Sequence, residues 1–349
     1  MRIQSEKEYD SYPLLIELGR CFRFPSYWGI LIIAIVLLLV LVLAASLDGV
    51  LTAILKGGFW RNFLDGPVLT IYILAIYPII WRLWWRSVKA IQSLLSVNEQ
   101  NSNRLVLEVP RNNRRWEWMA IIIGAMLWLA LWQPWGWGSR WESGAIWLSI
   151  YDVITQLILF GLLSLLLYDS FNGSRYIDRL SSQPMKLDIF NTEVLTPIAR
   201  SSLALSLAFI GGISLSLVFQ TQDDLIMWNN ILIWVILVGF AIVLFFLSMR
   251  SVHIAMFKAK QEKLTLARRH LTIATHNLEN RAIDKYRRGN EYSSAIALAA
   301  WATYEKQVRE TPEWPFDVRI IRRLFASVLV PASVYLLKVL SVLGIHISF

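Results

Sequence analysis

Long apolar runs separated by charged segments dominate the pattern of this chain. Seven runs have roughly 18 or more residues with little charge, which is the length of a helix that crosses a bilayer. A helix satisfies its backbone hydrogen bonds within one segment, as lipid requires, so each run predicts a membrane-spanning helix. The predicted spans are 28–47, 66–85, 117–135, 144–167, 200–219, 228–249 and 323–345.

The distribution of lysine and arginine predicts the orientation of these spans. Thirty of these residues fall on one side of the predicted bilayer, whereas three, Lys56, Arg61 and Arg140, fall on the other. An excess of lysine and arginine marks the cytoplasmic side, so we expect a cytoplasmic N-terminus and an outer C-terminus. The net charge of +9 follows from this topology and from contact with anionic lipid. It requires no nucleic-acid partner.

The segment between the sixth and seventh spans is predicted to form a cytosolic helical hairpin. Residues 250–310 contain no proline, and their one glycine is Gly289. Four apolar residues recur at intervals of seven, which predicts a helical seam: Phe257, Leu264, Leu271 and Leu278. Two alternatives fit this seam equally. It packs against a second helix at 293–308 of the same chain, or it self-associates as a coiled coil.

Two prolines in the sequence TPEWPFD end the hairpin and form an elbow before the last span. Trp314 and Phe316 are the predicted anchors of this elbow at the inner membrane interface. We therefore divide the chain into a membrane domain (1–249), a cytosolic hairpin with its elbow (250–321) and a last membrane helix (322–349).

Few residues are available for catalysis or for metal binding. The chain has one cysteine, Cys21, and its four histidines form neither an HExxH motif nor a Cys/His cluster. The glycines do not form a phosphate-binding loop, and no G-x-S-x-G nucleophile turn occurs. We therefore expect no cofactor and no metal, and we expect that the protein is not an enzyme.

A single lysine, Lys338, lies within the last apolar run. Charged residues inside spans are costly and usually have a role. In the fourth span, Ser149, Asp152 and Gln156 follow one another at i, i+3 and i+7, which predicts one polar face. Counted from the outer ends of their spans, Asp152 and Lys338 lie at almost the same depth. Two readings remain open: the amine of Lys338 reaches up to the outer surface, or it pairs with Asp152 or shares an aqueous cavity with it.

The last span also carries a weakly polar stripe with helical spacing. Its members are Ser327, Pro331, Val334, Lys338 and Ser341. A stripe of this kind suits the lining of a pathway, and it equally suits a buried contact between helices.

Three short sequences resemble motifs of a bacterial family of uncharacterised multi-pass membrane proteins. They are PEWPFD at the elbow, HIAMFK at the exit of the sixth span and LDIFNTEVLTPIARSSL at 187–203. The predicted topology is also similar to that of the insect chemoreceptor channel superfamily. That similarity implies cytosolic helices that hold an oligomer together and a seventh helix that lines a pore.

We therefore expect an all-α polytopic bundle of about seven spans in a bacterial inner membrane. The leading functional hypothesis is a homo-oligomeric protein, channel-like or ligand-sensing, with the last helix along the pathway. One alternative is a membrane scaffold or accessory subunit that binds a protein partner through its cytosolic helices. A second alternative is a small-solute transporter. The expected partners are the lipid bilayer, further copies of the chain and a cytosolic protein.

Overall fold

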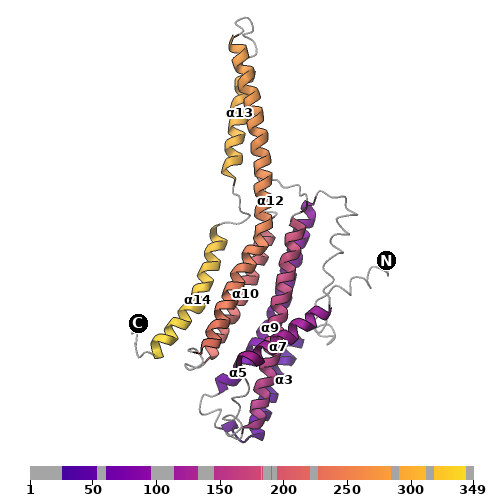
Figure 1. Cartoon of the computed structure of the whole chain (residues 1–349), viewed down its shortest axis with the longest axis vertical. Helices are drawn as coiled ribbons and strands as arrows, with labels where there is room; N and C mark the ends of the chain where they lie inside the picture. The colour runs from indigo at the N-terminus through magenta and orange to yellow at the C-terminus, as the bar shows by residue number, and fades with distance from the viewer. Residues whose placement is uncertain are drawn as a thin grey trace, which may run out of the picture.

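The computed structural model is almost entirely helical over the residues that it describes, which are 26–52, 60–95, 114–132, 145–181, 183, 190, 195–220, 227–283, 291–311 and 318–342. Within these ranges it contains eight helices (Figure 1). The all-α class is thereby confirmed. In chain order the helices are α3 (Ser26–Leu47), α5 (Trp60–Leu94), α7 (Arg114–Trp132), α9 (Ile146–Ser181), α10 (Thr196–Phe219), α12 (Trp228–Ile283), α13 (Glu291–Glu310) and α14 (Val318–Val342).

Five helices of the described residues are long and apolar enough to cross a membrane, namely α3, α5, α9, α10 and α12. The first of them exposes large apolar side chains such as Leu31, Leu39 and Leu43, as a helix in lipid would. The other two predicted spans correspond to α7 and to α14, which has three arginines among its first six residues. The seven-span count and the orientation remain predictions.

The core of the bundle lies where α5, α9, α10 and α12 meet. Fully buried apolar side chains come from each of these helices, among them Ile91, Leu165, Ile198 and Phe245. Around this core, α7 packs on α9, α3 packs on α5 and α9, and α14 packs on α10.

Glycine allows the close approach of α7 to α9. A methyl group added at Gly124 would lie 2.3 Å from the carbonyl oxygen of Phe160 and 2.6 Å from Cβ of Ser164. On the facing helix, a methyl group at Gly161 would lie 3.0 Å from Ile121. Small residues that let helix backbones approach are typical of membrane interfaces.

Hydroxyl groups join the helices of the core. Ser87 of α5 donates to Ser201 of α10 at 2.7 Å or to the Pro197 carbonyl at 3.0 Å. Ser206 of α10 reaches the Ala241 carbonyl of α12 at 2.8 Å. Such interhelical hydrogen bonds satisfy polar groups that lipid cannot solvate.

Helix α12 has 56 residues without a break and extends beyond the bundle, where α13 folds back along it (Figure 1). At the helical rise, its length is about 84 Å. The predicted continuation of the sixth span into a helical hairpin is therefore present. The proposed domain boundary at 249/250 falls inside this continuous helix.

The hairpin is held together by contacts within one chain. Leu264 of α12 and Val308 of α13 are buried against each other's helices, and Leu271 and Leu278 are half-buried. Of the two alternatives for the seam, the structure shows packing against the second helix of the same chain.

The placement of Phe257 in this seam was wrong, because its side chain is 41% exposed. Helix α13 runs back toward the bundle and ends level with Lys260, whose Nζ donates to the Thr311 carbonyl oxygen at 2.8 Å. Phe257 lies nearly one turn closer to the bundle than that end, so α13 no longer covers it.

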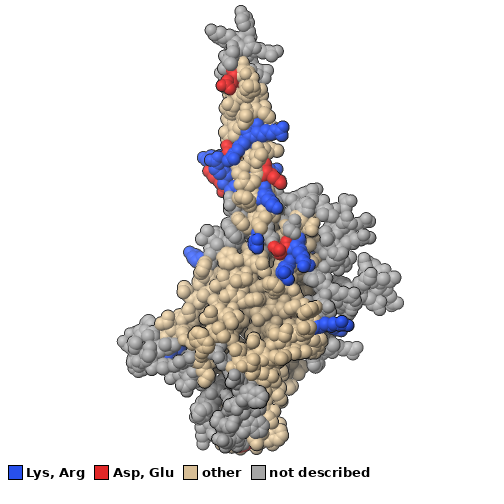
Figure 2. Space-filling view, viewed as in Figure 1, with Lys and Arg blue, Asp and Glu red and all other residues tan. Residues whose placement is uncertain are grey.

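Charged side chains gather on the hairpin and at its junction with the bundle, and they are sparse over the bundle body in the view of Figure 2. Glu305 of α13 accepts hydrogen bonds from Arg268 of α12 at 3.3 Å and from Arg309 at 2.9 Å. The side chains of His270 and Trp301 stack across the two helices with ring centroids 4.3 Å apart. These polar and aromatic contacts suit a water-exposed hairpin.

Candidate functional site

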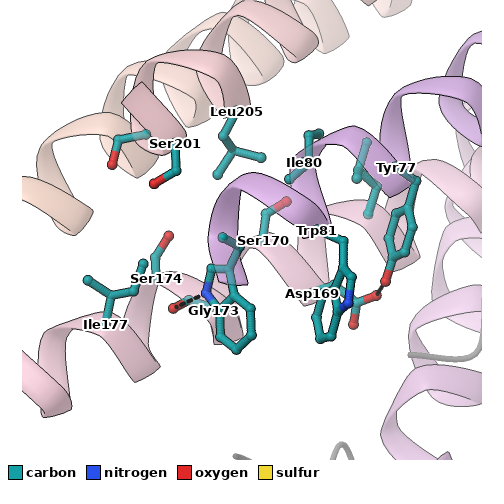
Figure 3. Close-up of a pocket in the computed structure, with 13 residues that line it drawn as sticks. Tyr77, Ile80, Trp81, Asp169, Ser170, Gly173, Ser174, Ile177, Ser201 and Leu205 are labelled. Atoms are coloured by element: carbon teal, nitrogen blue, oxygen red, sulfur yellow. Dashed lines mark hydrogen bonds between the residues drawn. The ribbon is translucent and has the colours of Figure 1, made fainter. Parts of the chain in front are cut away.

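A partly open cavity of about 60 Å³ lies between α5, α9 and α10 (Figure 3). Its wall combines one carboxylate, several hydroxyl groups, aromatic rings and aliphatic side chains. The lining residues are Tyr77, Ile80, Trp81, Trp84, Leu166, Asp169, Ser170, Gly173, Ser174, Ile177, Ser201, Ser202 and Leu205.

A hydrogen bond between α5 and α9 fixes the acidic end of the cavity. The hydroxyl of Tyr77 donates to Oδ2 of Asp169 at 2.6 Å, which is short and characteristic of a charge-assisted bond (Figure 3). A second acid, Glu117 of α7, is 2% exposed and lies close enough to Tyr77 to act on it electrostatically. The acidic end therefore carries two carboxyl groups near Tyr77.

Two indole rings form the aromatic wall. The rings of Trp81 and Trp84 stack with centroids 4.9 Å apart and an interplanar angle of 21°. The indole N–H of Trp84 donates to the Gly173 carbonyl at 3.2 Å, which holds the ring against α9. A methyl group at Gly173 would lie 3.0 Å from that indole nitrogen, so glycine leaves room for the ring.

Four serines line the remainder of the cavity. Ser201 and Ser202 donate to the Ile198 carbonyl of their own helix, at 2.9 and 3.0 Å. Ser170 differs from them. It is 8% exposed, it faces the cavity, and its hydroxyl makes no hydrogen bond to any residue that the structure describes.

Lys338 lies at the C-terminal end of α10, where its ammonium donates to backbone carbonyl oxygens. The acceptors are Leu217, Val218 at 3.3 Å and Gln220 at 2.9 Å. An ammonium has three donors, and the last carbonyls of a helix lack partners within the helix. The cation also opposes the negative end of the helix dipole. Lys338 thus caps α10. In the predicted topology this end of α10 is the outer one, so the contact agrees with an amine that reaches toward the outer surface and not with a pair to Asp152.

Asp152 lies on another part of the bundle. Its helix, α9, packs mainly on α5, α7 and α12, whereas α14 packs on α10. The polar stripe of α9 faces α5, since the Gln156 side-chain nitrogen lies 3.5 Å from a methyl group placed at Gly66. Ser149 donates to the Ala145 carbonyl of its own chain at 2.8 Å. The three residues thus lie along one helix, and Lys338 lies on α14, which packs on α10.

The weakly polar stripe of α14 faces its neighbours in the same chain. Pro331 is buried, and Ser327, Val334 and Lys338 are half-buried. Val334 packs with Ile213 and Leu217 of α10. Within one chain the stripe forms a helix–helix contact with α10. The lining of a pathway stays a prediction. The side chain of Ser341 and the elbow anchors Trp314 and Phe316 lie outside the described residues.

The cavity was not predicted from the sequence. Trp81 and Trp84 lie near the end of the second predicted span, and Asp169 lies two residues beyond the predicted end of the fourth. Glu117 was taken as the first residue of the third span. One feature of the sequence could have indicated the site. Asp169 and Glu117 both border apolar runs at the same predicted membrane face, where a charged side chain needs a partner.

The structure describes only part of the three sequences that resemble motifs of the bacterial family. PEWPFD lies outside the described residues, HIAMFK lies on α12, and the segment at 187–203 is described mainly where it enters α10. Membership of that family therefore remains a prediction. No protein-family model, no curated protein sequence and no solved structure matches this chain.

Proposed function

We propose that this protein is a ligand-sensing membrane protein in which the cavity between α5, α9 and α10 is the receiving site and the α12–α13 hairpin is the output. The observation that carries the proposal is the continuity of α12. Both α9 and α10 line the cavity, and both pack on α12. A change in their spacing therefore acts on the helix that forms the hairpin.

Contacts at the level of the cavity support this coupling. Ser201 and Ser202 of α10 line the cavity, and one turn further along the same helix Ser206 donates to the Ala241 carbonyl of α12. Phe209 of α10 and Phe240 of α12 meet edge to face at 5.8 Å. A ligand shifts a conformational equilibrium only by its differential affinity for the two states. The proposal therefore requires two arrangements of α10 against α12.

Spin labels test this proposal without a known ligand. In a Cys21→Ser background, one label replaces exposed Arg175 of α9 and a second replaces exposed Arg269 of α12. Ser170→Leu fills part of the cavity, whereas Ser214→Leu adds the same side chain to α10 outside the cavity lining. We expect the distance distribution between the labels to change with Ser170→Leu and to match the parent with Ser214→Leu. Equal distributions in all three folded proteins would refute the proposal.

A membrane scaffold that binds a protein partner is the second candidate. Large apolar side chains on the hairpin face solvent, among them Leu266 and Ile273 of α12 and Ile296 of α13, with exposed fractions of 46%, 48% and 66%. Exposed apolar side chains that cluster are typical of interaction surfaces. This candidate predicts that a partner or a second copy co-purifies with the chain and is lost from the Leu266→Glu and Ile273→Glu variants. Light scattering in mild detergent measures the mass.

A further inference from the structure

The cavity has a chemical character that selects a class of ligand. Its volume of about 60 Å³ is several times the roughly 10–15 Å³ that one water-sized sphere requires. It therefore admits a solute of about four or five non-hydrogen atoms. A drug-sized ligand would need a much larger site.

The charge of the lining favours a cation. Asp169 is the one carboxylic acid among the lining residues, which include no lysine, arginine or histidine. Glu117 of α7 places a second carboxyl group close enough to Tyr77 to act on it electrostatically. The exposed guanidinium of Arg175, the cation nearest in sequence on α9, stacks over Phe171 at 5.0 Å.

The hydrogen-bonding groups favour a ligand that donates. The Tyr77 hydroxyl already donates to Asp169, and the Trp84 indole N–H already donates to the Gly173 carbonyl. A ligand entering the cavity meets the Asp169 carboxylate and the hydroxyl oxygen of Ser170. Ser170 is 8% exposed as a residue, and its hydroxyl makes no hydrogen bond within the described part of the chain.

The aromatic wall favours an organic cation over a hydrated metal ion. The stacked rings of Trp81 and Trp84 supply π-faces to one side of the site. Tryptophan is the strongest partner in cation–π interactions, and aromatic walls recognise ammonium groups. Ile80, Leu166 and Leu205 offer apolar surface to a short alkyl substituent.

We propose that the cavity binds a small organic ammonium cation, with Asp169 and Ser170 accepting its N–H groups and the rings of Trp81 and Trp84 facing its charge. The apolar side chains of the lining contact its alkyl part. The inference rests on the proposed role of the cavity as a ligand site. The same ammonium chemistry is present in free short-chain amines and in the ethanolamine head group of a lipid, so the test separates these two sources.

Calorimetric titration of the purified full-length protein in detergent tests the class of ligand. The probe is propylammonium chloride, and its neutral isostere propan-1-ol is the matched control. We expect saturable binding of propylammonium and at least about tenfold weaker binding of propan-1-ol, because a charged hydrogen bond contributes more than a neutral one. Equal binding of the two, binding of neither, or displacement of propylammonium by equimolar potassium chloride would overturn the proposal.

Variants locate the binding. Asp169→Asn keeps an acceptor for Tyr77 and is expected to lower the affinity about 10- to 100-fold, and Ser170→Ala about 3- to 10-fold. Asp178→Asn, on the same helix but outside the cavity lining, is the matched control and should leave the affinity unchanged. If Asp169→Asn fails to fold, Trp81→Leu replaces it, with an expected loss of about 2- to 30-fold. Unchanged affinity in the folded cavity variants would overturn the assignment.

Nanodiscs identify the source of the ammonium group. If the lipid supplies it, propylammonium binds more weakly in nanodiscs of phosphatidylethanolamine than in nanodiscs of phosphatidylcholine, whose head group has the same net charge but no N–H group. If a soluble amine is the ligand, the two affinities are equal. Both results support the ammonium class. The spin-label experiment needs no ligand, so a failed titration does not refute the sensing proposal. Unchanged spin-label distances, in turn, do not refute binding of an ammonium cation.

Discussion

The ammonium of Lys338 in α14 donates a hydrogen bond to the carbonyl oxygen of Leu217 in the last turn of α10. It also reaches the carbonyls of Val218 and Gln220, so one side chain closes the end of another helix. The charge of Lys338 within an apolar run therefore has a structural explanation. The carbonyl oxygens at the end of α10, which accept its hydrogen bonds, have no partners within their own helix.

Replacement of this lysine should loosen α14 from α10. Lys338→Met keeps the length of the side chain but removes the donors, and we expect a loss of about 1–3 kcal/mol of stability. Lys338→Arg retains the charge and should lose less. Thermal unfolding in detergent measures the effect, and Lys258→Met, at an exposed position of α12, is the control. A Lys338→Met protein as stable as the control would contradict the capping role.

The contact between α7 and α9 depends on the absence of a side chain at Gly124. Gly124→Ala places a methyl group 2.3 Å from the backbone oxygen of Phe160, which cannot rotate away. We expect destabilisation of about 1–3 kcal/mol or more from overpacking. Gly239→Ala is the matched control, because a methyl group there meets nothing within 4 Å. Unfolding midpoints of the two variants in the same detergent check the prediction. Equal midpoints would show that α7 can move without cost.

A second lysine caps the hairpin. Lys260, which is 8% exposed, donates to the Thr311 carbonyl just after the last residue of α13. Lys260→Met should destabilise the last turns of α13 by about 1–3 kcal/mol and leave the bundle unchanged. Hydrogen exchange followed by mass spectrometry should show faster exchange in 303–311, with Lys263→Met as the exposed control. Unaltered exchange there would mean that packing alone holds the helix end.

The hairpin should lose stability in acid. Hydrogen bonds from Arg309 and Arg268 lower the pKa of Glu305 from its ordinary value of 4.5. A group whose folded pKa is lowered stabilises the fold above its unfolded pKa, and this stabilisation is lost as the pH falls through the folded value. Hydrogen exchange in the hairpin should therefore accelerate below about pH 4.5, once corrected for the intrinsic rate. The Glu305→Gln variant should show a weaker pH dependence. Parallel profiles for the two proteins would exclude Glu305 as the cause.

The sequence was sufficient for features that depend on one segment alone. Apolar run length predicted α3, α9 and α10, and the absence of proline together with the recurrence of leucine predicted the continuation of α12 with Leu264 in its seam. Phe257 was misplaced because the end of α13, not the heptad pattern, decides how far the seam extends.

Features that depend on which helices are neighbours could not be read from the pattern. Depth along a helix suggested that Lys338 pairs with Asp152, but depth carries no information about the lateral order of helices. In the structure, α10 lies against α14 and presents its carbonyl groups to the lysine. The cavity also depends on which helices are neighbours. Tyr77, Asp169 and Ser201 come from three helices, and their meeting is a property of packing.

Because α12 is one continuous helix, a tilt within the bundle also moves the part of the helix that extends beyond it. From Met249 to Ile283 the helix runs about 50 Å at 1.5 Å per residue. A tilt of about 5° at the level of the bundle would therefore displace the far end of the arm by roughly 4 Å. A displacement too small to disturb the bundle core becomes, at the tip of the arm, comparable to the spacing between side chains in an interface.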